Sequence, residues 1–385
     1  MVSCKSVYEP KEDSTMLERW VGRYANGKVL DVGTGSGVQA IAAAQNKNVA
    51  SVLATDIQKG AVDYCRKCIK HNKIRLVQSD LFKNIKGKFD TIIFNPPYLP
   101  QELKLKDLTI EGGKKGYEAI ERFLNEANSF LNQDGIILMV FSSLTKKEKV
   151  EELIKNNLLD FEELEKQHIF FEDIHVYLLR KNDFLKRLEN KKISSIRYFA
   201  KGHRGFLFAG KYKNKKVAIK AKNPKSEAFG RIENEVSWLK RLNKHKIGPK
   251  LLFSGDGYFI YEFIDGDFII NYIRKSSKMK VKKIIKNIFS QLFALDALKV
   301  DKEEMHHPVK HIIVARSKPF LIDFERCHYS HHPKNITQFC QFLMGIEKIL
   351  KNKGIMIKKQ EIMELAKVYK SNPSKLNFRK INDLA

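Results

Sequence analysis

The sequence has no apolar run of the roughly 18 residues that a membrane-spanning helix needs. Its first residues also lack the basic and then apolar pattern of a secretory signal peptide. Five cysteines are too few and too scattered to form a disulfide framework. These absences predict a cytoplasmic protein that neither enters a membrane nor depends on disulfide bonds.

Acidic residues are scarce in one half of the chain. Residues 1–183 hold 27 of the 71 lysines and arginines and 26 of the 44 acids, so 44 basic and 18 acidic residues remain for 184–385, a net charge of +26. Such an asymmetry in 385 residues predicts two domains, 1–183 and 184–385. The basic half is expected to contact a polyanion such as RNA or the ribosome. A general lysine bias without a binding role is the alternative, because the lysines are dispersed.

Residues 1–183 alternate short apolar runs with helical patterns. The expected strands are 29–32, 52–56, 74–77, 91–94 and 136–141, and the expected helices are 38–44, 60–72, 117–131 and 145–156. A Thr145-x-x-Glu148 capping box predicts the start of the last helix. This alternation predicts a parallel sheet with helices on both faces. Cys65 and Cys68 are expected to face the core from their helix rather than bind a metal.

Polar residues cluster where these strands end. The run Asp31-Val-Gly-Thr-Gly-Ser-Gly37 is a glycine-rich turn between a strand and a helix, which gives a nucleotide-like ligand a close backbone approach. Asp56 is placed to bind two ribose hydroxyls, and Asp80 an adenine amino group. Because ligands of such sheets bind at the carboxyl ends of the strands, these residues predict one S-adenosylmethionine site.

A loop of four residues, Asn95-Pro96-Pro97-Tyr98, follows the fourth strand. The nitrogen of an amide or aromatic amine is a poor nucleophile because its lone pair is delocalised. The Asn95 side-chain oxygen and the Pro96 carbonyl offer acceptors for its two hydrogens, and the prolines fix the backbone. Tyr98 is expected to stack on the planar group. The loop therefore predicts methyl transfer to a planar NH2 group, either of adenine or of a glutamine amide.

These motifs, with Tyr8-Glu-Pro, Glu12-Asp-Ser14 and Glu111-Gly-Gly-Lys-Lys-Gly116, make residues 1–183 resemble the HemK family of protein glutamine methyltransferases, in its short archaeal and eukaryotic branch. The resemblance implies a Rossmann-like class I methyltransferase with a seven-stranded, mostly parallel sheet. Its implied substrate is the glutamine of a Gly-Gly-Gln loop in a class 1 release factor. It also implies a small zinc-binding activator protein as partner. The residues expected at the cofactor are Ser14, Asp31, Gly33, Gly35, Gly37, Asp56, Asp80, Leu81 and Asn95.

A second reading of the same loop remains open. An adenine methyltransferase acting at N6 in DNA or RNA would need the same acceptors for an NH2 group. In that case the basic residues 184–385 would supply contacts to the nucleic acid backbone.

Residues 184–385 carry a different set of motifs. Gly202 and Gly205 lie in a glycine turn, Lys220 ends the run Val-Ala-Ile-Lys, and Glu235 begins a helical pattern. A strand at 258–263 and the run Leu-Ile-Asp323-Phe-Glu follow. In this order the elements resemble small atypical protein kinases of the RIO type and an archaeal group of serine/threonine kinases. The resemblance implies an α+β fold that binds ATP and Mg2+, with Asp323 as the metal ligand and Glu235 as the partner of Lys220.

The second half departs from the kinase pattern at the catalytic loop. The usual His-Arg-Asp sequence is replaced by Glu304-Met-His-His-Pro-Val-Lys310-His311. Glu304 is expected to orient the hydroxyl acceptor, and Lys310 or His311 to lie near the metal and phosphates. Glu325 replaces the glycine that follows Asp-Phe in kinases. An active kinase, a slow ATPase and a nucleotide-binding pseudokinase all fit this sequence.

Overall fold

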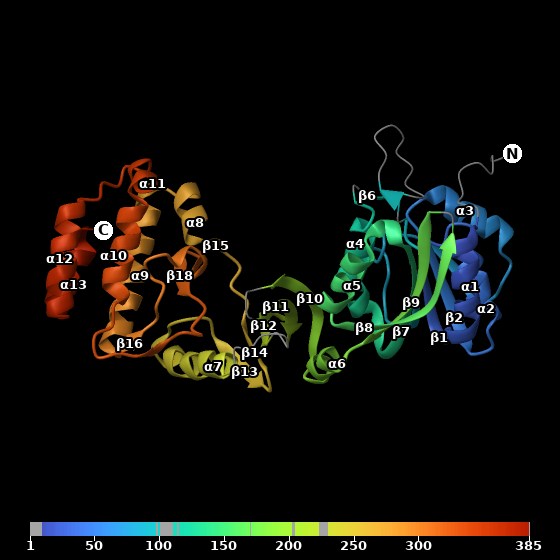
Figure 1. Cartoon of the computed structure of the whole chain (residues 1–385), viewed down its shortest axis with the longest axis horizontal. Helices are drawn as coiled ribbons and strands as arrows, with labels where there is room; N and C mark the ends of the chain where they lie inside the picture. Colours follow the sequence, from blue (N-terminus) through green and yellow to red (C-terminus); the bar gives the residue numbers. More distant parts are fainter. Residues whose placement is uncertain are drawn as a thin grey trace. The chain divides into compact units, whose positions relative to one another are not determined.

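The computed structural model describes residues 10–97, 99–100, 111–113, 115–169, 171–201, 205–222 and 230–384. The chain divides into two compact units, Met1–Tyr198 with Gly210–Lys213 and Phe199–Ala209 with Asn214–Ala385 (Figure 1). Within the described residues, no helix combines the length and the apolar character needed to cross a membrane.

The first unit is built on a seven-stranded sheet in the order β3-β2-β1-β4-β7-β9-β8. Its strands are β1 (Gly27–Val32), β2 (Val49–Asp56), β3 (Ile74–Gln78), β4 (Phe89–Phe94), β7 (Leu131–Ser142), β8 (Leu159–Ile169) and β9 (Glu172–Lys181). Neighbours from β3 to β7 pair in parallel, whereas β9 pairs antiparallel with both β7 and β8. The mostly parallel sheet of seven strands is therefore confirmed.

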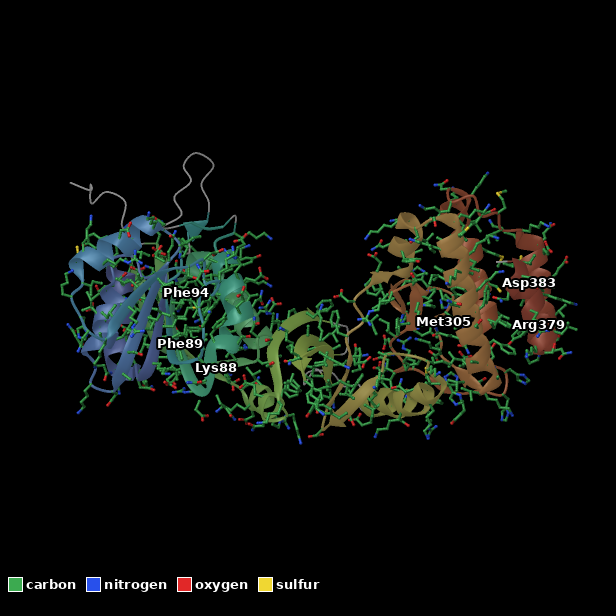
Figure 2. All side chains as sticks on the ribbon, turned by 180° about the vertical axis from the view of Figure 1, so that it is seen from behind. Lys88, Phe89, Phe94, Met305, Arg379 and Asp383 are labelled. Atoms are coloured by element: carbon green, nitrogen blue, oxygen red, sulfur yellow. The ribbon has the colours of Figure 1, made fainter. Side chains whose placement is uncertain are left out.

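Helices cover both faces of this sheet (Figure 1). They are α1 (Glu12–Tyr24), α2 (Val38–Gln45), α3 (Lys59–Cys68), α4 (Glu118–Phe130) and α5 (Lys147–Asn156). Two short strands, β5 (Leu99–Pro100) and β6 (Glu111–Gly113), precede α4, and helix α6 (Asp183–Asn190) follows β9. Alternate side chains of a strand point to opposite faces. Val29 accordingly packs with α1 and α2, while Leu30 packs with α4 and α5. Phe94, labelled in Figure 2, stacks on Phe123 with ring centroids 4.1 Å apart.

Three expectations for the helices of this unit are wrong. Helix α3 ends at Cys68 rather than at residue 72, and Cys68 is exposed instead of facing the core, whereas Cys65 is buried as expected. The Thr145 capping box does not form, because Thr145 belongs to a 3-10 turn, η2 (Ser143–Thr145), and its hydroxyl donates to the Ser142 carbonyl at 2.6 Å. Helix α5 instead begins after Lys146, whose φ is 62°.

A five-stranded sheet in the order β10-β11-β12-β14-β13 follows α6. Its strands are β10 (Ile193–Lys201), β11 (Gly205–Tyr212), β12 (Lys215–Lys222), β13 (Leu251–Gly255) and β14 (Tyr258–Glu262). Between β12 and β13 the chain forms helix α7 (Arg231–Leu242) and the 3-10 turn η3 (Asn243–His245). The β12–β14 and β13–β14 pairs are antiparallel. Helix α7 contacts the three strands β12, β13 and β14.

The rest of the second unit is mainly helical. Its helices are α8 (Ile269–Lys275), α9 (Lys278–Ala297), α10 (Asn335–Gly345), α11 (Glu347–Lys351), α12 (Lys359–Ser371) and α13 (Lys375–Leu384), with the 3-10 turn η4 (Pro308–Lys310) and the short strands β15 (Asp267–Phe268), β16 (Val300–Asp301), β17 (Ile312–Ala315), β18 (Lys318–Leu321) and β19 (His328–Tyr329). Strands β17 and β18 form a hairpin. Buried residues of α9, α10, α12 and α13 share one core with Met305, which Figure 2 labels.

Candidate functional site

Strand register brings the ends of β1, β2 and β4 to one edge of the first sheet. Val32 is level with Thr55 on β2 and with Phe94 on β4. The glycine loop, Asp56 and Asn95 each follow one of these residues directly. An ideal Cβ on Gly33 would lie 3.9 Å from the Asn95 carbonyl oxygen, which shows how closely the two loops approach.

The glycine loop depends on its glycines for backbone conformation. Gly33, Gly35 and Gly37 have φ values of 71°, 54° and 87°, in the left-handed region that residues with a Cβ rarely adopt. A Cβ on Gly37 would also clash with the Ile69 side chain. Gly37 leads directly into α2, so the loop ends at a helix start, where the N–H groups of the first turn have no acceptor within the helix.

Two predicted acids stabilise this loop from within. Asp56 accepts hydrogen bonds from the Gly35 N–H at 3.0 Å and the Gln58 N–H at 2.8 Å. Asp31 is almost wholly buried, and its carboxylate accepts from the Thr34 hydroxyl at 2.6 Å. Burial raises the pKa of Asp31 to about 7 and also raises the pKa of Asp56. Asp31 therefore stabilises the loop through its buried contact with Thr34, while Asp56, the last residue of β2, binds the loop at Gly35.

Asp80 lies at the end of β3 but already has a partner. Arg122 on α4 donates to both of its carboxylate oxygens, at 2.7 and 2.9 Å. The next residue, Leu81, has a φ of 47° and packs against the core on the α4 side. Arg122 lies 42 residues away in sequence, and no motif pointed to it.

The amide of Asn95 is held by two residues of α1. Its Nδ2 donates to Asp13 Oδ2 at 3.3 Å and to Ser14 Oγ at 3.2 Å. Asp13 and Ser14 are both buried, at 4% and 1% exposure. An ionised carboxylate only accepts hydrogen bonds, so the NH2 group must face Asp13 and the amide oxygen must face away. Asp13 had no role in the sequence-based prediction; Ser14 was expected at the cofactor.

The acceptor loop is described in part. Pro96 is buried and Pro97 is half-buried. Tyr98 lies outside the described residues, so its expected stacking role stays a prediction.

The residues around the glycine loop fit an S-adenosylmethionine site. Gln39, on the first turn of α2, donates to the Ser14 carbonyl at 2.8 Å. Its Oε1 is buried and has no hydrogen-bond partner among the described residues. A buried acceptor without a donor, beside a glycine loop that leads into a helix start, suits a ligand that carries an ammonium and hydroxyl groups.

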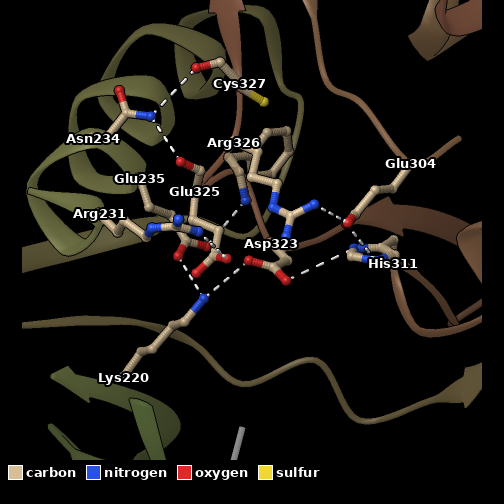
Figure 3. A network of polar contacts seen from close by, with 11 residues as sticks. Lys220, Arg231, Asn234, Glu235, Glu304, His311, Asp323, Glu325, Arg326 and Cys327 are labelled. Atoms are coloured by element: carbon tan, nitrogen blue, oxygen red, sulfur yellow. Dashed lines mark hydrogen bonds and ion pairs between the residues drawn. The ribbon is translucent and has the colours of Figure 1, made fainter. Parts of the chain in front are cut away.

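In the second unit the structure brings Lys220, Glu235 and Asp323 together (Figure 3). Lys220 Nζ lies 2.6 Å from Glu235 and 3.1 Å from Asp323. Burial disfavours the charge of Lys220, but the two carboxylates outweigh burial and raise its pKa. Burial raises the pKa of Glu235, whereas Lys220 and then Lys302 outweigh burial at Asp323 and lower its pKa. Glu235 also accepts from the Phe324 N–H at 3.2 Å.

The other residues that the kinase resemblance singled out differ in their burial and contacts. Gly202 lies outside the described residues. Gly205 begins β11, where a Cβ would come within 2.6 Å of the Ala221 carbonyl oxygen, so a close strand approach requires the glycine. Lys310 is exposed. Lys302, which the sequence did not single out, is buried and donates to the Asp323 carbonyl at 2.7 Å.

Glu304, His311 and Arg326 form a second group of contacts beside Asp323. Glu304 lies 2.6 Å from Arg326 and 3.1 Å from His311 Nε2. Burial, followed by Lys302, lowers the pKa of His311. The three residues line part of a cavity of about 700 Å³ that also includes His306 and His307.

Comparison with known proteins places the first unit in a family. Residues 13–171 match the Methyltransferase small domain. "Putative protein N5-glutamine methyltransferase MJ0928" of Methanocaldococcus jannaschii is 38% identical over 155 residues, covering 38% of this chain and 78% of that protein. The release factor glutamine methyltransferase of Streptococcus pneumoniae is 33% identical over 126 residues, covering 30% of this chain and 45% of that protein.

Two further relatives act on ribosomal RNA and on a translation termination factor by their descriptions. Ribosomal RNA small subunit methyltransferase C of Haemophilus influenzae is 31% identical over 161 residues, covering 41% of this chain and 44% of that protein. The solved Mtq2–Trm112 complex of E. cuniculi, described as methylating the translation termination factor eRF1, has 27% identity and a TM-score of 0.38, covering 46% of this chain and 99% of that one. The chain thus spans less than half the length of the S. pneumoniae and H. influenzae proteins.

The M. jannaschii protein is matched over most of its length. The chain therefore belongs to the protein N5-glutamine methyltransferase family built on the Methyltransferase small domain, and its first unit is an S-adenosylmethionine-dependent methyltransferase.

Proposed function

We propose that the first unit methylates the side-chain nitrogen of a protein glutamine, and that its substrate is the Gly-Gly-Gln loop of a class 1 release factor. The observation that carries this proposal is the orientation of the Asn95 amide. Asp13 and Ser14 take both hydrogens of its NH2 group, so Oδ1 is left to accept from a substrate.

The chain supplies two acceptors for a substrate NH2 group. Asn95 Oδ1 and the Pro96 carbonyl bind its two hydrogens and localise the nitrogen lone pair, which makes the nitrogen a better nucleophile. S-adenosylmethionine supplies an electrophilic methyl group on a sulfonium when bound. The glycine loop and Asp56 would hold that cofactor beside Asn95, because their strands end at the same level.

The relatives favour glutamine over a nucleobase. The M. jannaschii protein carries protein N5-glutamine in its name, and the S. pneumoniae protein acts on a release factor by its name. The H. influenzae ribosomal RNA enzyme keeps a nucleic acid substrate as the alternative. N6 methylation of adenine would use the same two acceptors.

Mass spectrometry of a release factor after incubation with the full chain and S-adenosylmethionine tests this proposal. The reaction is run with and without the small zinc-binding protein that the HemK resemblance implies as an activator. We expect one methyl group on the glutamine of the Gly-Gly-Gln loop. Asn95→Ala should reduce the rate by about 10²–10³-fold, the usual effect of losing one preorganised contact in a transition state.

A matched control is Asn72→Ala, which changes an exposed asparagine outside the site and should leave the rate unchanged. Cofactor affinity of Asn95→Ala should stay close to that of the wild type. Methylation of RNA or DNA in place of the release factor would contradict the glutamine proposal and support the adenine alternative.

We also propose that the second unit binds ATP with a divalent cation. The ion pairs of Lys220 with Glu235 and Asp323 carry this proposal, because kinases use such a lysine to hold nucleotide phosphates. Titration of the full chain with a fluorescent ATP analogue should show binding that Lys220→Ala abolishes. The exposed Lys215 on the same strand provides a control, Lys215→Ala, that should bind normally. Equal binding by both variants would contradict the nucleotide site.

A further inference from the structure

The orientation of the His311 ring is set by Glu304, which is itself held by Arg326. Its Nε2 lies 3.1 Å from Glu304 Oε2, and Glu304 Oε1 in turn lies 2.6 Å from Arg326 (Figure 3). Because a carboxylate accepts and does not donate, Nε2 is the nitrogen that carries the hydrogen in the neutral ring. The lone pair of the neutral imidazole is then on Nδ1.

The Nδ1 atom is buried and has no hydrogen-bond partner within the described part of the chain. It faces Asp323 Oδ2 at 3.8 Å, which is too long for a hydrogen bond. The other oxygen, Oδ1, is paired with Lys220. Two acceptor atoms therefore face each other with no donor between them, an arrangement that normally carries a cost.

A cation between these two atoms would satisfy both. Histidines that ligate metals almost always donate the other ring N–H to a carboxylate, and Glu304 Oε2, 3.1 Å from Nε2, is the carboxylate placed to accept it here. We propose that His311 Nδ1 and Asp323 Oδ2 ligate one divalent cation, with Glu304 and Arg326 fixing the imidazole. This inference rests on the proposed nucleotide site and names the metal ligands within it. Glu304 then positions His311 rather than the hydroxyl acceptor.

The neighbouring acids are a poorer site for that cation. Carboxylate oxygens of Glu235, Asp323 and Glu325 lie within 4.8 Å of one another. Lys220 already pairs with Glu235 and Asp323, and Arg231 lies 3.5 Å from Glu325. Those acids are thus paired directly with cations, whereas the described residues give His311 Nδ1 no hydrogen-bond partner, and Lys302, which lowers the pKa of both His311 and Asp323, donates to the Asp323 main-chain carbonyl rather than to its carboxylate.

An imidazole ligand also predicts which ion is preferred. Mg2+ favours an all-oxygen octahedron and keeps several waters. Among the ions that prefer carboxylate and phosphate oxygens, Mn2+ is a transition metal and accepts an imidazole nitrogen more readily than Mg2+ does. The site should therefore bind Mn2+ more tightly than Mg2+.

Electron paramagnetic resonance of Mn2+ bound to the full chain tests the ligand set directly. The sample contains Mn2+ with and without AMP-PCP, and electron spin echo modulation reports whether a nitrogen is bonded to the ion. We expect nitrogen coupling in the wild type. His311→Asn should keep an oxygen ligand but lose the coupling, and His311→Ala should bind Mn2+ at least about tenfold more weakly.

His307→Ala is the matched control, since His307 lines the same cavity but lies on its exposed side. It should retain both affinity and coupling. Mn2+ bound with AMP-PCP but without nitrogen coupling would overturn the role of His311 and leave the nucleotide site intact. The same holds if coupling survives in His311→Asn.

The two proposals can fail separately. Nitrogen-coupled Mn2+ that is insensitive to AMP-PCP would support the metal site and contradict the nucleotide site. A chain that binds neither Mn2+ nor AMP-PCP would overturn both.

Discussion

At the scale of single residues, the acceptor function proposed for Asn95 depends on a carboxylate on a different element, helix α1. The two ends of an asparagine amide have nearly the same shape, so packing alone does not decide which one faces a substrate. The Asp13 carboxylate decides it, because it repels the amide oxygen and binds the NH2 group. Asp13 is thus a positioning residue for the proposed reaction.

Asp13→Asn should lower the methyl transfer rate about 10- to 100-fold, because a neutral amide at this position allows Asn95 to turn over. Affinity for S-adenosylmethionine should change less than about twofold, since the contact of Asp13 that orients the amide is made with Asn95. Single-turnover rates and equilibrium dialysis of the cofactor measure the two quantities. Glu12→Gln, a similar change at an exposed neighbour, should alter neither.

A parallel fall in cofactor affinity and in melting temperature would show that Asp13 is structural instead. The same outcome for Ser14→Ala would extend that conclusion to the whole contact with α1.

Sequence motifs identify functional residues whose neighbours in the chain are also part of the site. They miss residues that come into contact only when distant parts of the chain fold together. Asn95 could be recognised in the sequence because it begins the Asn-Pro-Pro-Tyr loop, and Asp56 because it ends an apolar strand. Asp13 lies 82 residues from Asn95, and its contact follows only from the packing of α1. Lys302 was missed in favour of Lys310, because the burial of Lys302 and its contact with the Asp323 carbonyl join residues 21 positions apart.

At the scale of helices and strands, one buried acid links three helices of the second unit. Asp296 on α9 accepts from Asn335 Nδ2 on α10 at 2.8 Å and from the Tyr369 hydroxyl on α12 at 3.0 Å. Burial raises the pKa of Asp296 to about 7 from an ordinary value of 3.8. The helical core therefore contains a carboxyl that ionises reluctantly.

This pKa makes the stability of the second unit depend on pH. Between pH 3.8 and about 7 the folded state keeps a proton that the unfolded state has released, so this group destabilises the fold as the pH rises. Asp296→Asn removes the titration. The variant should gain stability relative to the wild type from pH 4 to pH 8, by at most about 4 kcal/mol. Urea unfolding at both pH values measures the difference.

Asp256→Asn changes an exposed acid and should give a curve parallel to that of the wild type. If the difference in unfolding free energy between the wild type and Asp296→Asn stays constant with pH, Asp296 is ionised in the folded state throughout this range, and the prediction is wrong.

Strands were predicted better than the ends of helices, for a physical reason. Apolar residues mark the buried length of a parallel strand, so the last residues of β1, β2 and β4 agree with the sequence pattern. A helix start depends on whether a side chain finds its cap. Thr145 satisfies its own turn instead of α5, and a sequence pattern does not distinguish these two uses.

At the scale of the whole molecule, the excess of basic residues lies in the second half of the chain. The five lysines of α9 (Lys278–Ala297) illustrate it, since all lie in its first nine residues among buried residues of the core. We propose that such lysines give the second unit its affinity for RNA. The alternative is that the charge is dispersed and has no binding role.

Binding of the full chain to single-stranded RNA should weaken at least about tenfold between 50 and 200 mM salt, because bound phosphates release counterions. The double change Lys280→Glu and Lys283→Glu should weaken binding at low salt. Lys47→Glu with Lys67→Glu alters the total charge equally in the first unit and should have little effect. Fluorescence anisotropy measures all three. A flat salt dependence, or equal losses in both double variants, would contradict the proposal.

The shared register of β1, β2 and β4 limits how this protein can vary. A strand can exchange one apolar residue for another and still end at the same level, so Gly33, Asp56 and Asn95 keep their places. One residue added within a strand would turn every later side chain to the opposite face and carry the loop out of line. Inherited or engineered changes should therefore be tolerated in the composition of these strands and in the loops before them, but not in their length.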